Sequence, residues 1–160
     1  MSASAYPIHP NTHSSAPLCV LDSSCLLASV FQEPGGEKVR ALLAGAMMSA
    51  VNWSEFVQKA AQYGVDTLGM RSDAEGAGLR IMPVTVDLAE AAAALWPVGK
   101  KVGLSLGDRM CLALAQQYRA TAYTTDVAWT ACVFDFPIVC IRPPRPASAV
   151  HEAMPKALYS

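Results

Sequence analysis

The chain is poor in charge and in histidine, and both shortages narrow its possible functions. Charged residues make up 16% of the 160 residues, and the formal net charge is −1. Any binding of nucleic acid must therefore depend on local patches or on bound metal. The three histidines lie at positions 9, 13 and 151, near the two ends of the chain. A serine or cysteine nucleophile in the centre of the chain has no plausible histidine base.

Several motifs that mark common enzyme classes are also missing. The sequence has no glycine-rich phosphate-binding loop, no dinucleotide-binding GxGxxG and no GxSxG nucleophile elbow. It has no uninterrupted apolar run long enough to span a bilayer, and no basic N-terminal segment followed by an apolar run. The five cysteines are odd in number and form no CxxC pair, which is typical of free thiols. We expect a cytoplasmic protein without a membrane span.

The apolar fraction of 52% is ample for the core of one domain. Apolar runs alternate with segments of helical periodicity, which predicts an α/β fold with a mainly parallel sheet and helices on both faces. Strands are expected at 18–21, 46–51, 79–84, 121–124 and 137–141, and helices at 24–31, 37–43, 52–63, 65–75, 86–96 and 106–118. Residues 97–103 are expected to form a loop, and residues 1–16 and 143–160 to form tails around a domain at 17–142.

Four acidic residues stand where a predicted strand ends or the next helix begins: Asp22, Glu55, Asp108 and Asp126. Each has a simple explanation as a helix cap, because Asn52-x-x-Glu55 and Ser105-x-x-Asp108 both fit a capping box. Taken singly, capping is the favoured interpretation. In a parallel sheet, however, all four positions share the edge where α/β folds bind ligands.

Four carboxylates at one edge repel one another, and a divalent cation relieves that repulsion. Oxygen ligands of this kind suit Mg²⁺ or Mn²⁺ better than zinc. A metal held by carboxylates can orient water and accept a phosphate oxygen. The four acids together therefore predict hydrolysis of a phosphodiester.

Four segments carry a resemblance to a known family: VLDSS at 20–24, SAVNWSE at 49–55, LSLGDR at 104–109 and TTDVAW at 124–129. In this order and spacing they resemble the PIN-domain ribonucleases, and in particular the VapC-type toxins of bacterial toxin–antitoxin pairs. The resemblance implies a three-layer α/β/α fold. It also implies a Mg²⁺- or Mn²⁺-dependent endoribonuclease that is dimeric and is inhibited by a cognate antitoxin.

The resemblance also implies roles for single residues. The acid of each motif falls on Asp22, Glu55, Asp108 and Asp126, which are expected to be catalytic and to bind the metal. The hydroxyl groups of Ser23, Thr124 and Thr125 are expected to support the site.

Three basic residues flank the predicted edge of the sheet: Lys100, Lys101 and Arg109. They are candidates for contacts with RNA phosphates. The alternative is that the two lysines belong to a solvated loop and that Arg109 pairs with a neighbouring acid.

Other functions remain open from the sequence. A non-catalytic PIN-like scaffold would bind only a protein partner, although a scaffold has no need for repulsive acids. A DNA nuclease or a phosphatase could use the same metal site, because that site acts on the phosphate and not on the sugar. We expect a homodimer whose interface is either the segment 52–75, with exposed-looking Trp53, Phe56 and Met70, or the neighbouring strand edge.

Overall fold

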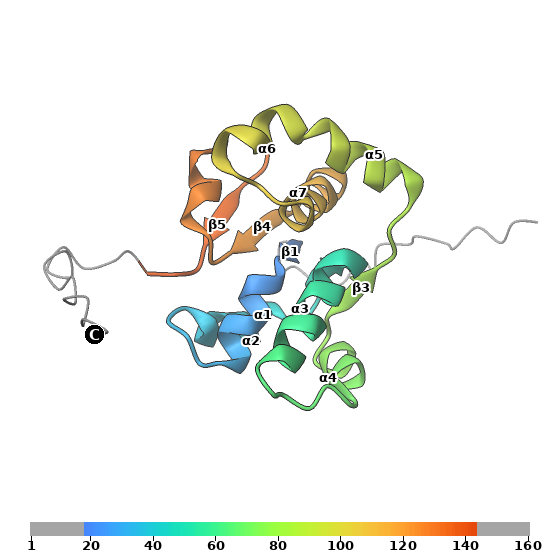
Figure 1. Cartoon of the computed structure of the whole chain (residues 1–160), viewed down its shortest axis with the longest axis vertical. Helices are drawn as coiled ribbons and strands as arrows, with labels where there is room; N and C mark the ends of the chain where they lie inside the picture. Colours follow the sequence, from blue (N-terminus) through green and yellow to red (C-terminus); the bar gives the residue numbers. More distant parts are fainter. Residues whose placement is uncertain (1–17, 144–160) are drawn as a thin grey trace, which may run out of the picture.

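The computed structural model describes residues 18–143 and shows a parallel sheet with helices on both faces (Figure 1). The strands are β1 (Cys19–Leu21), β2 (Met47–Ser49), β3 (Arg80–Met82), β4 (Thr121–Thr124) and β5 (Ile138–Cys140). Their order across the sheet is β3-β2-β1-β4-β5, and every pairing is parallel. The predicted three-layer α/β/α fold is confirmed. The strand order reverses between β1 and β4, and ligands of open parallel sheets bind at such a reversal.

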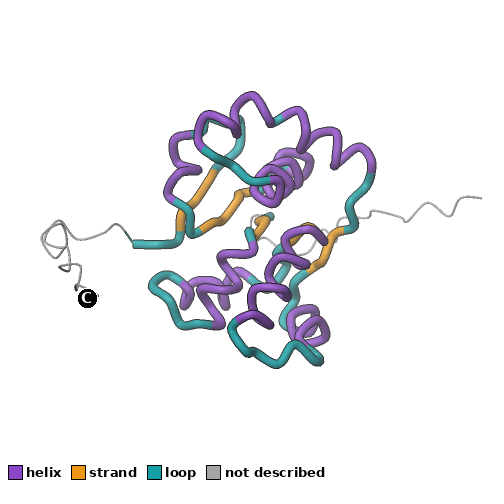
Figure 2. Tube along the Cα trace, in the orientation of Figure 1, coloured by secondary structure: helices purple, strands orange, loops and turns teal. Residues whose placement is uncertain are grey.

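The helices divide between the two faces of the sheet (Figure 2). One face is covered by α1 (Ser23–Val30), α2 (Val39–Leu42), α3 (Ala50–Gln62) and α4 (Met70–Gly76). The other is covered by α5 (Val86–Ala94), α6 (Trp96–Val102) and α7 (Leu106–Tyr118). Two short 3-10 helices, η1 (Gly36–Lys38) and η2 (Val127–Ala131), precede α2 and follow β4.

The pleat of the central strands supplies both halves of the core. Val20 and Met47 belong to the cluster beneath α5 and α7, whereas Leu21 and Met48 belong to the cluster beneath α1 and α3. All four side chains are fully buried. This explains why the central strands appear in the sequence as continuous apolar runs rather than as alternating ones.

The main error of the sequence prediction is the expected loop at 97–103, because α6 occupies Trp96–Val102. Pro97 lies in the first turn of this helix, where proline is tolerated because its missing N–H would have no partner. Gly99 is buried, and a Cβ there would lie 3.1 Å from the Arg109 Cδ atom. Pro97 and Gly99 both have low helix propensity, yet both are compatible with this short helix.

The boundary between β2 and α3 also differs from the prediction. The strand ends at Ser49 and the helix begins at Ala50, so the Ser49 side chain, and not Asn52, accepts the capping hydrogen bond. The helix expected from residue 65 begins only at Met70. Phe56, expected to be exposed, is only 3% exposed, which weakens the case for the segment 52–75 as an interface.

None of the helices within residues 18–143 combines the length and the apolar character needed to cross a bilayer. The expected tail at 1–16, and all but the first residue of the expected tail at 143–160, lie outside the described residues.

Candidate functional site

Asp22 is the centre of the candidate site. It follows β1 directly, caps the N-terminus of α1, and is only 4% exposed. Its Oδ2 atom accepts a hydrogen bond of 2.6 Å from the Ser24 hydroxyl, and its Oδ1 atom accepts one of 3.0 Å from the Asn52 side-chain amide. The hydroxyls of Ser23 and Thr124 each lie 3.5 Å from the carboxylate. Side chains from three elements therefore fix the orientation of this buried acid.

Asn52 connects Asp22 to the opposite side of the site. Its side-chain nitrogen also donates to the Gly107 carbonyl at 3.1 Å, and its Oδ1 atom accepts from the Ser49 hydroxyl at 2.5 Å. The sequence prediction gave Asn52 only a capping role, which is wrong. A signal was present, because Asn52, Phe56 and Ala60 recur at a spacing of four and all three are buried. A polar residue on the apolar stripe of a helix indicates a partner inside the fold.

Glu55 lies one turn further along α3, with its side chain 32% exposed. Its Oε1 atom pairs with Lys59 at 2.5 Å. Its Oε2 atom faces Gly107, where an added Cβ would lie only 2.9 Å away. Gly107 therefore leaves the space into which this carboxylate points. The capping box predicted for Asn52 and Glu55 is not formed, because Asn52 is not the N-cap residue of α3.

Asp108 and Asp126 are both held by hydrogen bonds to nearby backbone. Asp108 accepts from the Ser105 backbone N–H at 2.7 Å, and the Ser105 hydroxyl accepts from the Asp108 N–H at 3.1 Å, so the predicted capping box is present. Asp126 caps η2 by accepting from the Ala128 N–H at 2.9 Å. The Thr124 hydroxyl accepts from the Asp126 N–H at 3.0 Å and thus links this acid to Asp22.

The pKa values show that these acids share one electrostatic environment. Burial raises the pKa of Asp22 to about 6; the charges of Asp108 and Glu55 act in the same direction, and the hydrogen bonds from Ser24 oppose them. Burial also raises the pKa of Asp108, and Glu55 and Asp126 add to that increase. Repulsion between the acids, which the sequence predicted, is therefore present in the fold.

The donor set fits a divalent cation in its chemistry. The four acids offer only oxygen ligands, and Lys59 is the only basic side chain in an ion pair with any of them among residues 18–143. In the same part of the chain, no three His, Cys, Asp or Glu side chains stand close enough together to hold an ion as they are. The acids affect one another electrostatically, and Asn52 connects Asp22 to the segment that carries Asp108. Binding of a cation would relieve the repulsion between the acids.

The three predicted phosphate-binding residues are not equivalent. Lys100 and Lys101 are exposed at the end of α6. Arg109 donates to the Ala92 carbonyl at 3.1 Å, and its guanidinium carbon lies 5.3 Å from the centre of the Trp96 ring. Arg109 thus attaches α7 to α5 and α6, and it forms no ion pair with an acid of the described chain.

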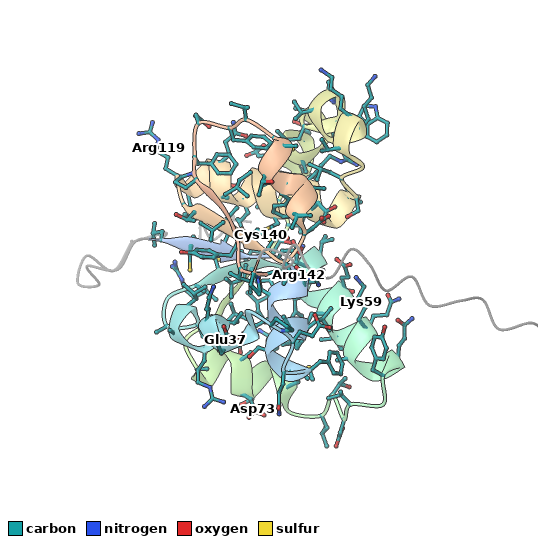
Figure 3. The ribbon with its side chains drawn as sticks, turned by 90° about the vertical axis from the view of Figure 1, so that its left-hand side faces the viewer. Glu37, Lys59, Asp73, Arg119, Cys140 and Arg142 are labelled. Carbon is teal, nitrogen blue, oxygen red and sulfur yellow. The ribbon has the colours of Figure 1, made fainter. Side chains whose placement is uncertain are left out.

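A hollow of about 410 Å³ lies beside Asp22, between α1, α3 and the segment after β5. The Ser24 hydroxyl forms part of its wall, and this hydroxyl also accepts from the Thr125 backbone N–H at 3.1 Å. Lys59 and Arg142 contribute two positive charges to the lining (Figure 3). The sequence prediction missed Ser24 and Lys59. Lys59 had a signal, since it stands four residues after Glu55 on one helix face.

Comparisons with known proteins place the chain in a structural context. The model of the PIN domain family matches residues 19–131, which is more than half of the chain. The chain is similar to a toxin–antitoxin complex from Klebsiella pneumoniae, with 20% identity and a TM-score of 0.56 over 75% of this chain and 99% of that one. It is also similar to VapC20 of Mycobacterium tuberculosis, described as a toxin that cleaves the sarcin-ricin loop. There the identity is 19% and the TM-score 0.61, over 78% of this chain and 99% of that one. No curated protein sequence matches the chain significantly.

Proposed function

We infer, because the chain belongs to the PIN domain family, that it is a metal-dependent endoribonuclease and the toxin of a toxin–antitoxin pair. The fold that it shares with toxin–antitoxin proteins supports the second part of this proposal. A non-catalytic scaffold is disfavoured, because burying a carboxylate beside other acids costs stability that a scaffold has no reason to lose.

The observation that carries the proposal is the environment of Asp22. A carboxylate that is 4% exposed, with a pKa raised to about 6 and with Asp108 and Glu55 in its field, is a functional-site candidate on physical grounds. It stands at the reversal of strand order between β1 and β4. Four side chains form hydrogen bonds to the Asp22 carboxylate and hold it in one orientation. Little reorganisation is therefore needed when the ionised carboxylate acts.

The residues that would hold a Mg²⁺ or Mn²⁺ ion are Asp22, Glu55, Asp108 and Asp126. When bound, such an ion supplies a Lewis acid and an activated water for attack on phosphorus. Asn52 keeps Asp22 and the start of α7 at a fixed separation through its two hydrogen bonds. Lys59 pairs with Glu55 and holds its position, and Gly107 leaves room for that carboxylate. The hydroxyls of Ser23 and Thr124 orient Asp22, whereas Thr125 contributes through its backbone N–H.

The test compares substrates and metals on the purified full chain. We expect cleavage of single-stranded RNA with Mg²⁺ or Mn²⁺ and none with EDTA. We expect little or no hydrolysis of single-stranded DNA or of a simple phosphomonoester. Equal cleavage of DNA would show that the protein is a nuclease without a preference for RNA. Hydrolysis of the phosphomonoester alone would indicate a phosphatase. Retention of full RNA cleavage in EDTA would reject the metal site.

Two partners belong to the same proposal. A nuclease that degrades cellular RNA must be restrained, so we propose a cognate antitoxin that inhibits cleavage when it binds. We also propose a homodimer, although the fold buries Phe56 and leaves Trp53 and Met70 only partly exposed. Sedimentation at micromolar concentration tests the dimer, and a monomer there would reject it.

A further inference from the structure

The hollow beside Asp22 is continuous with the candidate site. Ser24 belongs to both, because its hydroxyl donates to Asp22 at 2.6 Å while it lines the hollow. Thr125, whose backbone N–H donates to that hydroxyl, lines the hollow next to Ser24. A polymer bound at the acids therefore meets this hollow as the next space along the surface.

Two positive charges, Lys59 and Arg142, line the hollow together with one acid, Glu33, and each cation forms a partly exposed ion pair. Arg142 is 53% exposed and lies 3.6 Å from Glu33, and Lys59 is 43% exposed and pairs with Glu55. Ion pairs this exposed contribute little to stability, so exchange of a carboxylate for a phosphate is inexpensive. Figure 3 shows Arg142 near the centre of the view with Lys59 close to its right, and Arg119 at the upper left, away from both. With Lys59, Arg142 and Glu33 as its charged residues, the lining of the hollow has a formal net charge of +1 in a chain of net charge −1.

An aromatic pair forms another part of the lining. Phe31 follows α1 and Tyr63 follows α3, and their ring centres are 5.2 Å apart with the planes at 68°. Tyr63 is 74% exposed, so its ring is available to a ligand. Exposed aromatic rings next to positive charges are the usual surface on which single-stranded nucleic acid stacks its bases.

We propose that this hollow binds one nucleotide of single-stranded RNA beside the cleaved phosphodiester. The base packs against Tyr63 and Phe31, and Arg142 contacts a flanking phosphate in exchange for Glu33. The volume of about 410 Å³ lies within the range of small-molecule sites. This inference rests on the proposed nuclease function and assigns to it a binding surface on α1 and α3 rather than on α6.

The first experiment tests base stacking in the full chain carrying Asp22→Asn, which keeps the RNA intact. The affinity for a labelled single-stranded RNA of about ten nucleotides is measured by fluorescence anisotropy. Tyr63→Phe keeps the ring and should bind like its parent. Tyr63→Leu keeps an apolar side chain without a π-face and should bind about tenfold more weakly. Because Tyr63 is 74% exposed, thermal melting should show both variants folded.

The second experiment tests the phosphate contact through its salt dependence. Loss of one phosphate contact should reduce the slope of log affinity against log salt by about 0.7. We expect this reduction in Arg142→Gln and no change in Arg119→Gln, the matched control on the exposed end of α7.

Unchanged affinity and slope in every variant would overturn the inference, and the hollow would then be free for a segment of a protein partner. Equal losses in Tyr63→Phe and Tyr63→Leu would overturn base stacking. Failure of the nuclease proposal is seen separately, in the cleavage assay of the chain without Asp22→Asn. If that chain cleaves nothing while Tyr63→Leu and Arg142→Gln still weaken RNA binding, the binding surface stands and the nuclease does not.

Discussion

Asp22 and the acids around it are held in place by different kinds of contact. Asp22 is bonded by side chains from α1, α3 and β4, which the fold must bring together. Asp108 and Asp126 bond the backbone two or three residues away, as ordinary helix caps do. Glu55 pairs with Lys59 on its own helix. The position of Asp22, the inner acid, therefore depends on the complete fold. The positions of the three outer acids, Glu55, Asp108 and Asp126, depend mainly on contacts within their own segments.

The largest effect should be on cleavage, and here the inner and outer acids should not differ. Asp22→Asn and Asp108→Asn should each lower the rate of RNA cleavage at saturating Mg²⁺ by about a hundredfold or more, because each removes a proposed metal ligand. Asp73→Asn, on the exposed surface of α4, is the matched control and should cleave normally. Full activity in both site variants would reject the assignment of the acids.

The second effect is on the pH dependence of stability, to which Asp22 should contribute through its raised pKa. Because burial raises the folded-state pKa of Asp22 to about 6 from 3.8, its protonated form stabilises the fold. That contribution is fully present below about pH 4 and is lost as pH rises through about 6, with an upper limit of about 3 kcal/mol. In EDTA, Asp22→Asn should therefore gain stability relative to the native chain between about pH 4.5 and about pH 7.5.

The measurement is the free energy of unfolding by urea at both pH values. A difference between the two proteins that does not change with pH would contradict the assigned environment of Asp22.

A smaller effect should follow from loss of an outer cap. Ser105→Ala removes the hydroxyl that accepts from the Asp108 N–H and should destabilise the protein by about 1 kcal/mol. Ser105→Thr restores the hydroxyl and should recover most of this loss. Both are measured by urea unfolding in Mg²⁺-free buffer. A loss of several kcal/mol would show that α7 depends on its cap far more than a local contact allows.

The smallest effect concerns the lysines of α6. Lys100→Gln together with Lys101→Gln should weaken RNA binding only a few-fold, since exposed lysines act at a distance as point charges. Arg142→Gln should weaken it more if the hollow is the main contact. If the two lysine substitutions weaken RNA binding more than Arg142→Gln does, the main RNA contact lies on α6 instead.

The sequence predicts best where local and tertiary signals agree. The helix at 106–118 and the strand at 121–124 have the expected bounds, because a cap, an apolar stripe and a β-branched run coincide there. The positions of the four acids follow from the same logic, since strand ends in a parallel sheet share one edge. The pKa values of Asp22 and Asp108 are consistent with this placement.

What the sequence did not predict depends on contacts between distant segments. The bond from Asn52 to Asp22 joins residues 30 apart, and the bond from Asn52 to Gly107 joins residues 55 apart. The helix at α6 was missed because Pro97 and Gly99 are breakers by propensity, while packing against Arg109 favours glycine at position 99. Arg142 reaches the hollow only because β5 lies at the edge beside β4.

The pairing of β1 with β4 has a consequence for the protein during its synthesis on the ribosome. The Thr124 hydroxyl and Asp22 lie 102 residues apart, and the Asp22 N–H donates to the Tyr123 carbonyl. At bacterial or eukaryotic rates of translation, the ribosome needs roughly 5 to 20 seconds to make the residues between them. During that interval the nascent chain carries Asp22 without its partner strand and without Asp126. The candidate site therefore cannot be assembled until β4 has been synthesised and has entered the sheet beside β1.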